Sequence, residues 1–253
     1  MHRKIQLLFA VLLIGGLMLG GCTPDQASVS SPTSPATQTT SPTTTPTTQT
    51  SSPQMNLPVL EGTATVVMTV NSSPITIEVD GKNAPVTAGN FVDLVQRGVY
   101  DGLVFHRVVR QPEPFVVQGG DPQSKNPNFP PQRLGTGGFI DPNTGSERFI
   151  PLEIKPKGAA EPVYSQTFEK ARISTPPQLP HTRGAVAMAR SQQPDSASSQ
   201  FYFALADLPF LDGSYAVFGY VTDGMDVVDQ IQQGDRIESA QVTQGAENLR
   251  GGQ

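Results

Sequence analysis

The stretch that decides the fold reads Phe105-His106-Arg107-Val108-Val109 and, after a short turn, Phe115-Val116-Val117-Gln118-Gly119-Gly120-Asp121. Both runs are rich in β-branched and aromatic residues and lie near Gly or Pro, which is typical of short strands. Arg107 and Gln118 carry several hydrogen-bonding groups each, and they stand out within otherwise apolar strands. We therefore take these two residues as the first candidates for a functional site.

β-type segments continue on both sides of this pair. Apolar residues occupy alternate positions in 63–70, and a second β-rich run at 75–79 follows the turn Asn71-Ser72-Ser73-Pro74. The two runs predict a hairpin. Several short strands with few helices are typical of a barrel or a sandwich. The other predicted strands cover residues 103–109, 115–118, 149–154, 185–190, 200–204, 216–221 and 237–242.

Two segments have helical periodicity. Val86 to Arg97 places its apolar residues on one helical face, with Thr87 as the expected N-cap and Gly98 as the stop. Met225 to Gln232 follows Asp223-Gly224 and predicts a second helix. We therefore expect a mainly β domain with two helices.

Residues 121–182 differ from the rest, because they are rich in Gly and Pro turns around one predicted strand. A long irregular segment inside a compact domain is usually a functional loop or a poorly ordered insertion. The sequence leaves both possibilities open.

The composition argues against several classes of function. The net charge is -5 and no basic run extends beyond Arg3-Lys4, so nucleic acid is not an expected partner. A single Cys excludes a disulfide framework, and the three His residues, one of them His2, do not provide a multi-histidine metal site. The chain also lacks a Gly-x-Ser-x-Gly elbow, a Walker loop and a Gly-x-Gly-x-x-Gly motif. We therefore expect neither a metal nor a cofactor.

Further motifs complete a family pattern with the two opening runs. These are Met188-Ala189, Ser199-Gln200-Phe201-Tyr202, Phe210-Leu211-Asp212-Gly213 and Val217-Phe218-Gly219. In order and spacing the sequence resembles the cyclophilin family of peptidyl-prolyl cis-trans isomerases across most of residues 63–242. The resemblance implies a closed eight-stranded antiparallel β-barrel capped by two α-helices, with a peptide groove on its outer surface.

The resemblance also assigns roles to residues of this chain. Arg107 is the expected catalytic hydrogen-bond donor, and Gln118 and Gln200 are expected to hold the peptide in position. The proline pocket and the neighbouring groove have a larger set of expected residues, and among them the backbone of Ala189 and Arg190 is expected to contact the substrate. They are Phe115 and Val116, Ala189 and Arg190, and Tyr202, Phe210, Leu211 and Tyr215.

Without the family pattern, ordinary core packing would be the preferred interpretation of Phe115, Tyr202 and Phe210. His106 alternates with Arg107 along a strand, so its side chain should lie on the opposite side. We expect His106 to be a structural histidine with its hydrogen bonds satisfied, rather than a proton donor.

Several positions depart from the best-known family members. Phe210, Arg190 and Tyr215 stand where those members carry Trp, Asn and His, and Val116 replaces a Met. The missing indole makes tight cyclosporin binding less expected than catalysis. The run 110–114 is a few residues longer than usual, so substrate access and selectivity are expected to differ.

The N-terminus resembles an export signal followed by a lipid attachment site. Residues 1–21 begin with positive charge and continue with an apolar stretch of about fifteen residues, shorter than the roughly 20 that a spanning helix needs. Leu19-Gly20-Gly21-Cys22 resembles the lipobox of bacterial lipoproteins, which predicts lipidation of Cys22. The alternative is an ordinary signal peptide with a nearby buried Cys.

A polar linker is expected after the lipid site. Residues 23–58 contain 11 Thr, 7 Ser and 7 Pro with Asp25 as the single charge, and such a composition cannot bury enough apolar surface to fold. We therefore expect a lipidated Cys plus a disordered linker at 22–58, and an isomerase domain at 59–253 that holds the insertion around 121–182. A glycosylated stalk or a docking segment is the alternative for the linker.

The expected function is a peptidyl-prolyl cis-trans isomerase, or rotamase, that assists the folding of exported proteins. Its partners would be proline-containing polypeptides and, through the lipid anchor, a bacterial membrane, with the domain facing the periplasm or the outer side. A monomer is expected. Two alternatives stay open: a chaperone that binds proline segments with little catalysis, and a membrane-anchored interaction module.

Overall fold

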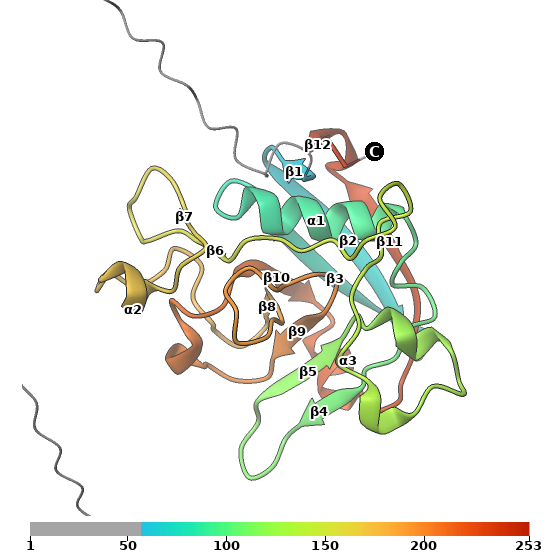
Figure 1. The fold of residues 1–253 in the computed structure, drawn as a ribbon. Helices are drawn as coiled ribbons and strands as arrows, with labels where there is room; N and C mark the ends of the chain where they lie inside the picture. The colour runs from blue at the N-terminus through green and yellow to red at the C-terminus, as the bar shows by residue number, and fades with distance from the viewer. Residues whose placement is uncertain (1–56, 253) are drawn as a thin grey trace, which may run out of the picture. The chain divides into compact units, whose positions relative to one another are not determined.

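The computed structural model describes residues 57–252, and an antiparallel sheet of eight strands forms their frame (Figure 1). Cys22 and the predicted signal and linker up to residue 56 lie outside the described residues. No helix within residues 57–252 has the length and apolarity needed to cross a membrane. In spatial order the strands are β11 (Ile237–Gln244), β2 (Thr63–Val70), β3 (Ser73–Asp80), β10 (Val217–Asp223), β8 (Ala185–Met188), β9 (Phe201–Ala204), β5 (Val116–Gly119) and β4 (Arg107–Val109).

The predicted hairpin at the start of the domain is confirmed as β2 and β3. The two strands pair from Thr63↔Asp80 to Val70↔Ser73. Asn71 and Ser72 link them with positive φ angles of 51° and 61°, the conformation of a two-residue turn that matches strand twist. Alternate residues of β2 are buried, as the apolar alternation predicts.

The sheet is not the closed barrel that the resemblance implied. β11 and β4 stand at opposite ends of the strand order. The predicted strand at 103–109 is shortened because its first part turns to residues 234–237, where the Phe105 amide donates to the Asp235 carbonyl at 2.9 Å. Among the described residues a single isolated bridge, Val104↔Arg236, joins these two edges. The result is an open, curled sheet of eight strands.

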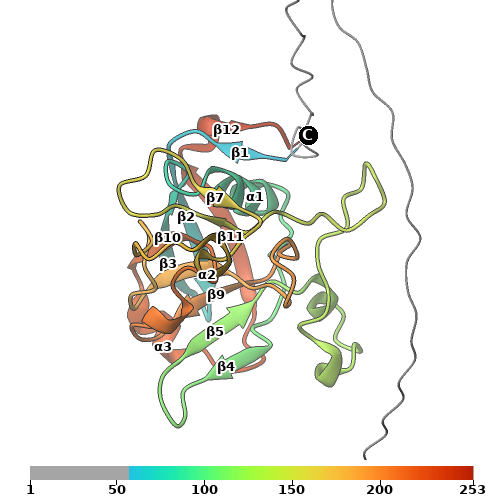
Figure 2. The same ribbon diagram turned by 60° about the vertical axis from the view of Figure 1, so that its left-hand side comes forward.

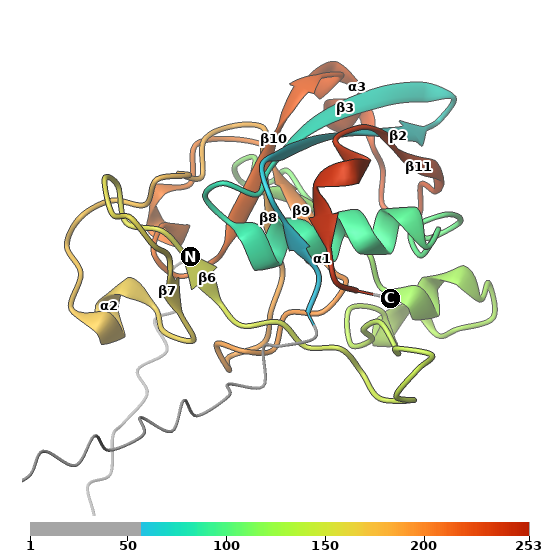
Figure 3. The ribbon, with the colours of Figure 1, turned by 90° about the horizontal axis from the view of Figure 1, so that it is seen from above.

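Helix α1 (Pro85–Gln96) fills the curve of this sheet (Figure 3). Gly98 follows it with a φ of 64° and ends it as predicted. The predicted N-cap, Thr87, is wrong, because the helix begins two residues earlier and the Thr87 amide donates to the Glu153 carboxylate at 2.7 Å. The second predicted helix is confirmed as α3 (Met225–Gln230), which ends two residues earlier than expected.

The main core lies between α1 and the sheet and is rich in aromatic side chains. Phe91 of α1 contacts Phe218 with ring centroids 4.8 Å apart. A smaller buried cluster occupies the opposite face of β8 and β9, because side chains alternate along a strand. Tyr202 belongs to that second face, whereas its neighbours Phe201 and Phe203 belong to the main core.

The 121–182 insertion is built from short elements held by specific contacts. β6 (Glu153–Ile154) pairs with β7 (Val163–Tyr164), and helix α2 (Phe168–Ala171) follows. These elements lie together at one side of the sheet, away from β11 (Figures 1 and 3). The predicted strand at 149–154 is therefore confirmed only over its last two residues.

The remaining short elements lie at the ends of the described region and in the connections. β1 (Val59–Leu60) pairs with β12 (Leu249–Arg250), and Figure 2 shows both beside α1. The β4–β5 hairpin projects at the other end of the sheet in the same view. Within residues 57–252, four single-turn 3₁₀ helices cover Pro122–Lys125, Pro131–Arg133, Pro209–Leu211 and Ala246–Asn248.

Candidate active site

Strand register brings the two opening candidates together. β4 and β5 pair so that Arg107 stands directly opposite Gln118, which in turn stands opposite Tyr202 of β9. The Arg107 Nη1 donates to Gln118 Oε1 at 3.3 Å. The Gln118 amide nitrogen donates to Gln200 Oε1 at 3.0 Å, and the Gln200 amide nitrogen donates to the Gly137 carbonyl at 2.7 Å. These bonds form one polar row that runs from β4 and β5 to the residue before β9 and to a loop.

The Arg107 guanidinium is available at the surface of this row. Arg107 is exposed, and no carboxylate among residues 57–252 lies within ion-pair distance of it. Its Cζ lies 5.4 Å from the centroid of the Phe115 ring. A cation over an aromatic face is held by the ring quadrupole. The Phe115 ring therefore orients the guanidinium, and the N–H groups that do not bond to Gln118 stay free for a ligand.

A cavity of about 250 Å³ opens beside Arg107. Tyr202 and Tyr215 form part of its wall and meet edge to face, with ring centroids 6.2 Å apart. A volume of this size is large enough to hold a proline ring. Its lining consists of Arg107, Phe115, Val116, Gln118, Ala189, Arg190, Tyr202, Leu211 and Tyr215.

Two of the predicted groove residues lie outside this lining. Phe210 stacks on Phe115 at a centroid distance of 6.0 Å and is 70% exposed, so plain core packing is wrong for Phe210. Gln200 lines a neighbouring cavity instead. Tyr202, by contrast, is 5% exposed and serves both as a wall of the cavity and as part of the smaller buried cluster.

The neighbouring cavity has a volume of about 460 Å³ and shares Gln118, Ala189 and Arg190 with the first. The sequence interpretation missed its outer rim, where Glu147 and Phe149 come from the 121–182 insertion. Burial raises the pKa of Glu147, and nearby Asp121 adds to the effect. The run Gly135-Thr136-Gly137 also lines this cavity, a position that depends on the tertiary fold and not on a local pattern.

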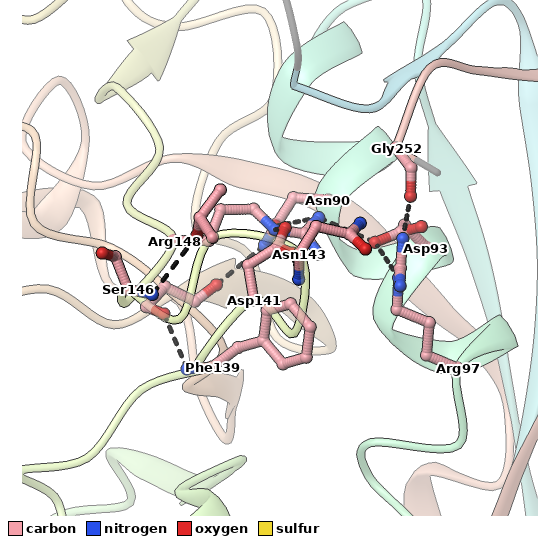
Figure 4. Close-up of polar contacts among 11 residues, drawn as sticks. Asn90, Asp93, Arg97, Phe139, Asp141, Asn143, Ser146, Arg148 and Gly252 are labelled. Atoms are coloured by element: carbon pink, nitrogen blue, oxygen red, sulfur yellow. Dashed lines mark hydrogen bonds and ion pairs between the residues drawn. The ribbon is translucent and has the colours of Figure 1, made fainter.

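A buried ion pair anchors this rim from behind (Figure 4). Arg148 lies between Glu147 and Phe149 in the chain but turns toward α1, where its Nη1 donates to Asp93 Oδ2 at 2.7 Å. The Arg148 guanidinium lies 4.6 Å from the centroid of the Phe139 ring. The rim is therefore fixed to α1 by a charged contact inside the domain.

Arg190 connects two walls of the first cavity. Its Nη2 donates to the Ser214 carbonyl at 2.7 Å, and its Cζ lies 4.7 Å from the Tyr215 ring centroid. The Ala189 amide already donates to the Gln200 carbonyl at 2.9 Å. Within the described part of the chain, the Ala189 carbonyl and the Arg190 amide have no such partner, so these groups are the ones a bound peptide could pair with.

His181 is a residue of the site that the sequence interpretation missed. Its Nδ1 lies 2.8 Å from Asp212 Oδ1, and its Nε2 lies 3.0 Å from the hydroxyl of Tyr202. Burial lowers the pKa of His181, while the Asp212 carboxylate opposes this effect. The three residues are far apart in sequence, so no local motif points to their contact.

His106 directly precedes β4 and, as predicted, faces away from Arg107, because it lines a separate cavity of about 300 Å³. Protein groups in the described region do not satisfy its hydrogen bonds, which differs from the expectation. Neither ring nitrogen has a partner among residues 57–252, although both are buried. Burial lowers the pKa of His106, and the neighbouring Arg107 acts in the same direction.

Comparisons with known proteins agree with this geometry. Residues 65–247 match the family described as cyclophilin type peptidyl-prolyl cis-trans isomerase. A putative thylakoid lumen peptidyl-prolyl cis-trans isomerase of Synechocystis sp. is 47% identical, over 78% of this chain and 51% of the relative. A probable peptidyl-prolyl cis-trans isomerase of Brucella abortus is 35% identical, over 70% of this chain and 76% of that protein.

A solved cyclophilin type isomerase of Cryptosporidium parvum has the same fold, with a TM-score of 0.53 at 22% identity, over 72% of this chain and 98% of that one. The chain spans about half the length of some curated relatives, 51% of the Synechocystis protein and 45% of a chloroplast isomerase of Arabidopsis thaliana. The family match covers most of the described residues and includes the polar row and both cavities. The chain therefore belongs to the family of cyclophilin-type peptidyl-prolyl cis-trans isomerases.

Proposed function

We propose that this protein accelerates the cis-trans rotation of X-Pro peptide bonds in exported polypeptides and so assists their folding. The observation that carries this function is the exposed Arg107 guanidinium beside a cavity large enough for a proline ring. Family membership supports the same activity.

The reaction needs no bond to break. Rotation must overcome a barrier of about 18 to 20 kcal/mol that amide resonance imposes. Uncatalysed exchange takes tens of seconds or longer. In the twisted state the proline nitrogen regains its lone pair and becomes a better hydrogen-bond acceptor. A catalyst therefore needs an apolar slot for the proline ring and a donor aimed at that nitrogen.

In this proposal Arg107 is the donor and the 250 Å³ cavity is the slot. Gln118 holds the guanidinium from one side at 3.3 Å, and the Phe115 ring supports it from below. An acceleration of five decades requires roughly 7 kcal/mol of selective transition-state stabilisation. A preorganised charged donor in a partly water-excluded site is the kind of group that supplies a large share of such an effect.

An isomerase assay on an X-Pro peptide tests this assignment. We expect Arg107→Ala to lose most of the catalysed rate while the protein stays folded. Arg133→Ala is the matched control, because Arg133 is an exposed arginine that lines neither cavity of the site. Equal rates for wild type and Arg107→Ala would contradict the proposed role of the guanidinium.

A second function, binding of proline segments as a chaperone, is favoured by large apolar side chains at the surface. Phe210 is 70% exposed and stacks on Phe115 of the first cavity, and Phe149 is 49% exposed and lines the second cavity. Suppression of aggregation by Arg107→Ala as strongly as by wild type would support this function. Loss of suppression together with loss of isomerase activity would support catalysis instead.

We further propose that residues 1–21 direct export, that Cys22 carries a lipid anchor in a bacterial membrane, and that residues 23–58 link the anchor to an isomerase domain at 59–253. The lipobox-like sequence before Cys22 supports the anchor. The name of the Synechocystis relative places that protein in the thylakoid lumen, which supports export. Labelling with a lipid precursor should disappear in Cys22→Ala, and retained labelling would contradict lipidation at this residue.

The domain is proposed to act as a monomer without metal or cofactor, on proline-containing polypeptides. At about 3 Å per residue, the linker could hold the domain on the order of 100 Å from the membrane when fully extended. Sedimentation of the purified protein tests the oligomeric state, and a stable dimer would contradict the monomer.

A further inference from the structure

The insertion reaches the candidate proline cavity from behind. The loop that follows Leu208 supplies Leu211 and Tyr215 to the cavity wall. Two residues of the insertion, Phe168 and His181, contact this loop without lining the cavity themselves. Figure 1 shows α2 beside this loop, at the same side of the sheet.

His181 is held by several hydrogen bonds at once. Asp212 Oδ1 accepts from both the backbone amide and the Nδ1 of His181, each at 2.8 Å. The carbonyl of His181 accepts from the Leu208 amide at 2.7 Å. Because Nδ1–H is used toward Asp212, Nε2 is the acceptor, and it faces the Tyr202 hydroxyl at 3.0 Å. The imidazole therefore ties Asp212 of the loop to the Tyr202 ring of the cavity wall, and the His181 backbone holds the start of the loop at Leu208.

The contact between His181 and Tyr202 is buried on both sides. His181 is 2% exposed and Tyr202 is 5% exposed. Their rings are nearly parallel, with an interplanar angle of 14°. A hydrogen bond in such a place fixes the orientation of the phenol, because a rotated ring would leave a buried donor and a buried acceptor without partners.

Phe168 contacts the same loop at Gly213, the residue after Asp212. Its amide donates to the Gly213 carbonyl at 2.8 Å. Gly213 has a φ of 73°, and a Cβ built there would lie 2.8 Å from the Cβ of Phe168. The Phe168 side chain also packs with Leu152 and Ala216 in a small apolar cluster. The loop is thus supported by the insertion at Asp212 and again at Gly213.

We propose that the 151–182 part of the insertion sets the shape of the proline cavity, with His181 acting as a positioning residue for Tyr202 and for the loop that carries Leu211 and Tyr215. This role rests on the proposed isomerase function of the cavity. It assigns to the insertion a task in substrate binding and not in transition-state chemistry, since none of its residues in this segment lines the cavity.

The expected kinetic signature follows from that distinction. A wall that contacts the proline ring equally in the ground state and in the transition state changes KM while kcat stays the same. We expect Tyr202→Phe and His181→Gln each to raise KM by about three- to tenfold, the effect of one lost buried hydrogen bond. Each variant should keep kcat within about twofold. Arg107→Ala should instead reduce kcat.

A double-mutant cycle separates this role from general destabilisation. If His181 acts through the Tyr202 hydroxyl, the double variant should have about the same KM as either single variant, because both remove one contact. His106→Gln is the matched control: it changes another histidine, which is half-buried and lines a different cavity, and should leave KM unchanged. Phe168→Leu should keep a near-normal KM where Phe168→Ala raises it.

Binding of an Ala-Pro peptide, followed by NMR shifts of Leu211 and Tyr215, gives a readout that does not depend on catalysis. We expect weaker binding in His181→Gln and Tyr202→Phe. Unchanged peptide affinity and unchanged KM in both, in fully folded protein, would overturn the positioning role. If the KM increases of the two single variants multiply in the double variant, as they do for independent sites, the positioning role is also overturned. If both variants bind the Ala-Pro peptide more weakly while wild type has no isomerase activity, the proposed function is contradicted and the positioning role is not.

Discussion

Replacing Asp93 by asparagine removes the negative charge that faces Arg148 inside the domain. In the native protein Asp93 Oδ2 accepts from Arg148 Nη1 at 2.7 Å and from Arg97 Nε at 2.8 Å. The side chains of Arg148 and Asp93 are 7% and 6% exposed, whereas that of Arg97 is 24% exposed. Arg97 can turn to water when the carboxylate is lost, but Arg148 cannot.

The cost of Asp93→Asn follows from what remains around Arg148. Asn90 Oδ1 lies 3.4 Å from its Nη1 and Asp141 Oδ2 lies 3.8 Å from its Nε. Its Nε and Nη2 already have no hydrogen-bond partner in the described region. Removing one partner of a buried pair typically costs about 3 to 5 kcal/mol. Because these weak contacts remain, we expect about 3 kcal/mol, which corresponds to about 6 to 12 °C in Tm for a domain of this size.

Urea and thermal unfolding measure this difference. Asp229→Asn is the matched control, since it breaks the Arg183–Asp229 pair, in which both side chains are 44% exposed. Exposed pairs contribute about 0 to 1 kcal/mol. Asp93→Asn must therefore be destabilising by clearly more than Asp229→Asn. Equal losses in the two variants would refute the idea that a buried charge pair holds the rim of the second cavity to α1.

Three further changes have defined outcomes. Burial raises the folded-state pKa of Glu153 above 4.5. The unfolding free energy of wild type should therefore fall relative to that of Glu153→Gln as pH rises from about 4.5 through the raised pKa. Parallel curves of unfolding free energy against pH for the two proteins would contradict this. The folded-state pKa of His106 is lowered from 6.5, so the wild-type domain should lose stability as pH falls below 6.5. His106→Leu should reduce that loss without lowering stability at pH 7. A loss of about 2 kcal/mol at pH 7 would contradict the absence of hydrogen-bond partners for the imidazole. Phe210→Ala removes an exposed ring that is stacked on Phe115. The variant should change stability by less than about 1 kcal/mol and raise KM several-fold. An unchanged KM would place Phe210 outside the substrate site.

The elements that could be predicted from the sequence are those with a strong local pattern. β2 and β3 follow directly from alternation and the Asn71-Ser72 turn, and α1 follows from its periodicity and Gly98. β4 was predicted too long, because residues 102–105 exchange hydrogen bonds with a distant segment near Asp235. Competition of that kind is decided by tertiary structure and leaves no local signal.

The candidate site shows the same division. Arg107 and Gln118 were each predicted as site residues, because both stand in recognisable strand motifs of the family, whereas their direct pairing follows from the strand register. The contact of His181 with Tyr202 spans 21 positions and that with Asp212 spans 31, and no spacing rule connects such residues. The Glu153 carboxylate that receives the first amides of α1 is likewise 66 positions from Thr87. Long-range polar contacts of this kind could not be inferred from one sequence.

The interconversion rate of a single X-Pro bond, measured by exchange NMR on a short peptide with a catalytic amount of the protein, tests the proposed function most directly. Wild type should accelerate exchange by several orders of magnitude over the protein-free rate, Arg133→Ala should match it, and Arg107→Ala should fall close to the protein-free rate while remaining folded. Exchange that stays at the protein-free rate with wild type, or that is equally fast with Arg107→Ala, would contradict catalysis by the Arg107 guanidinium.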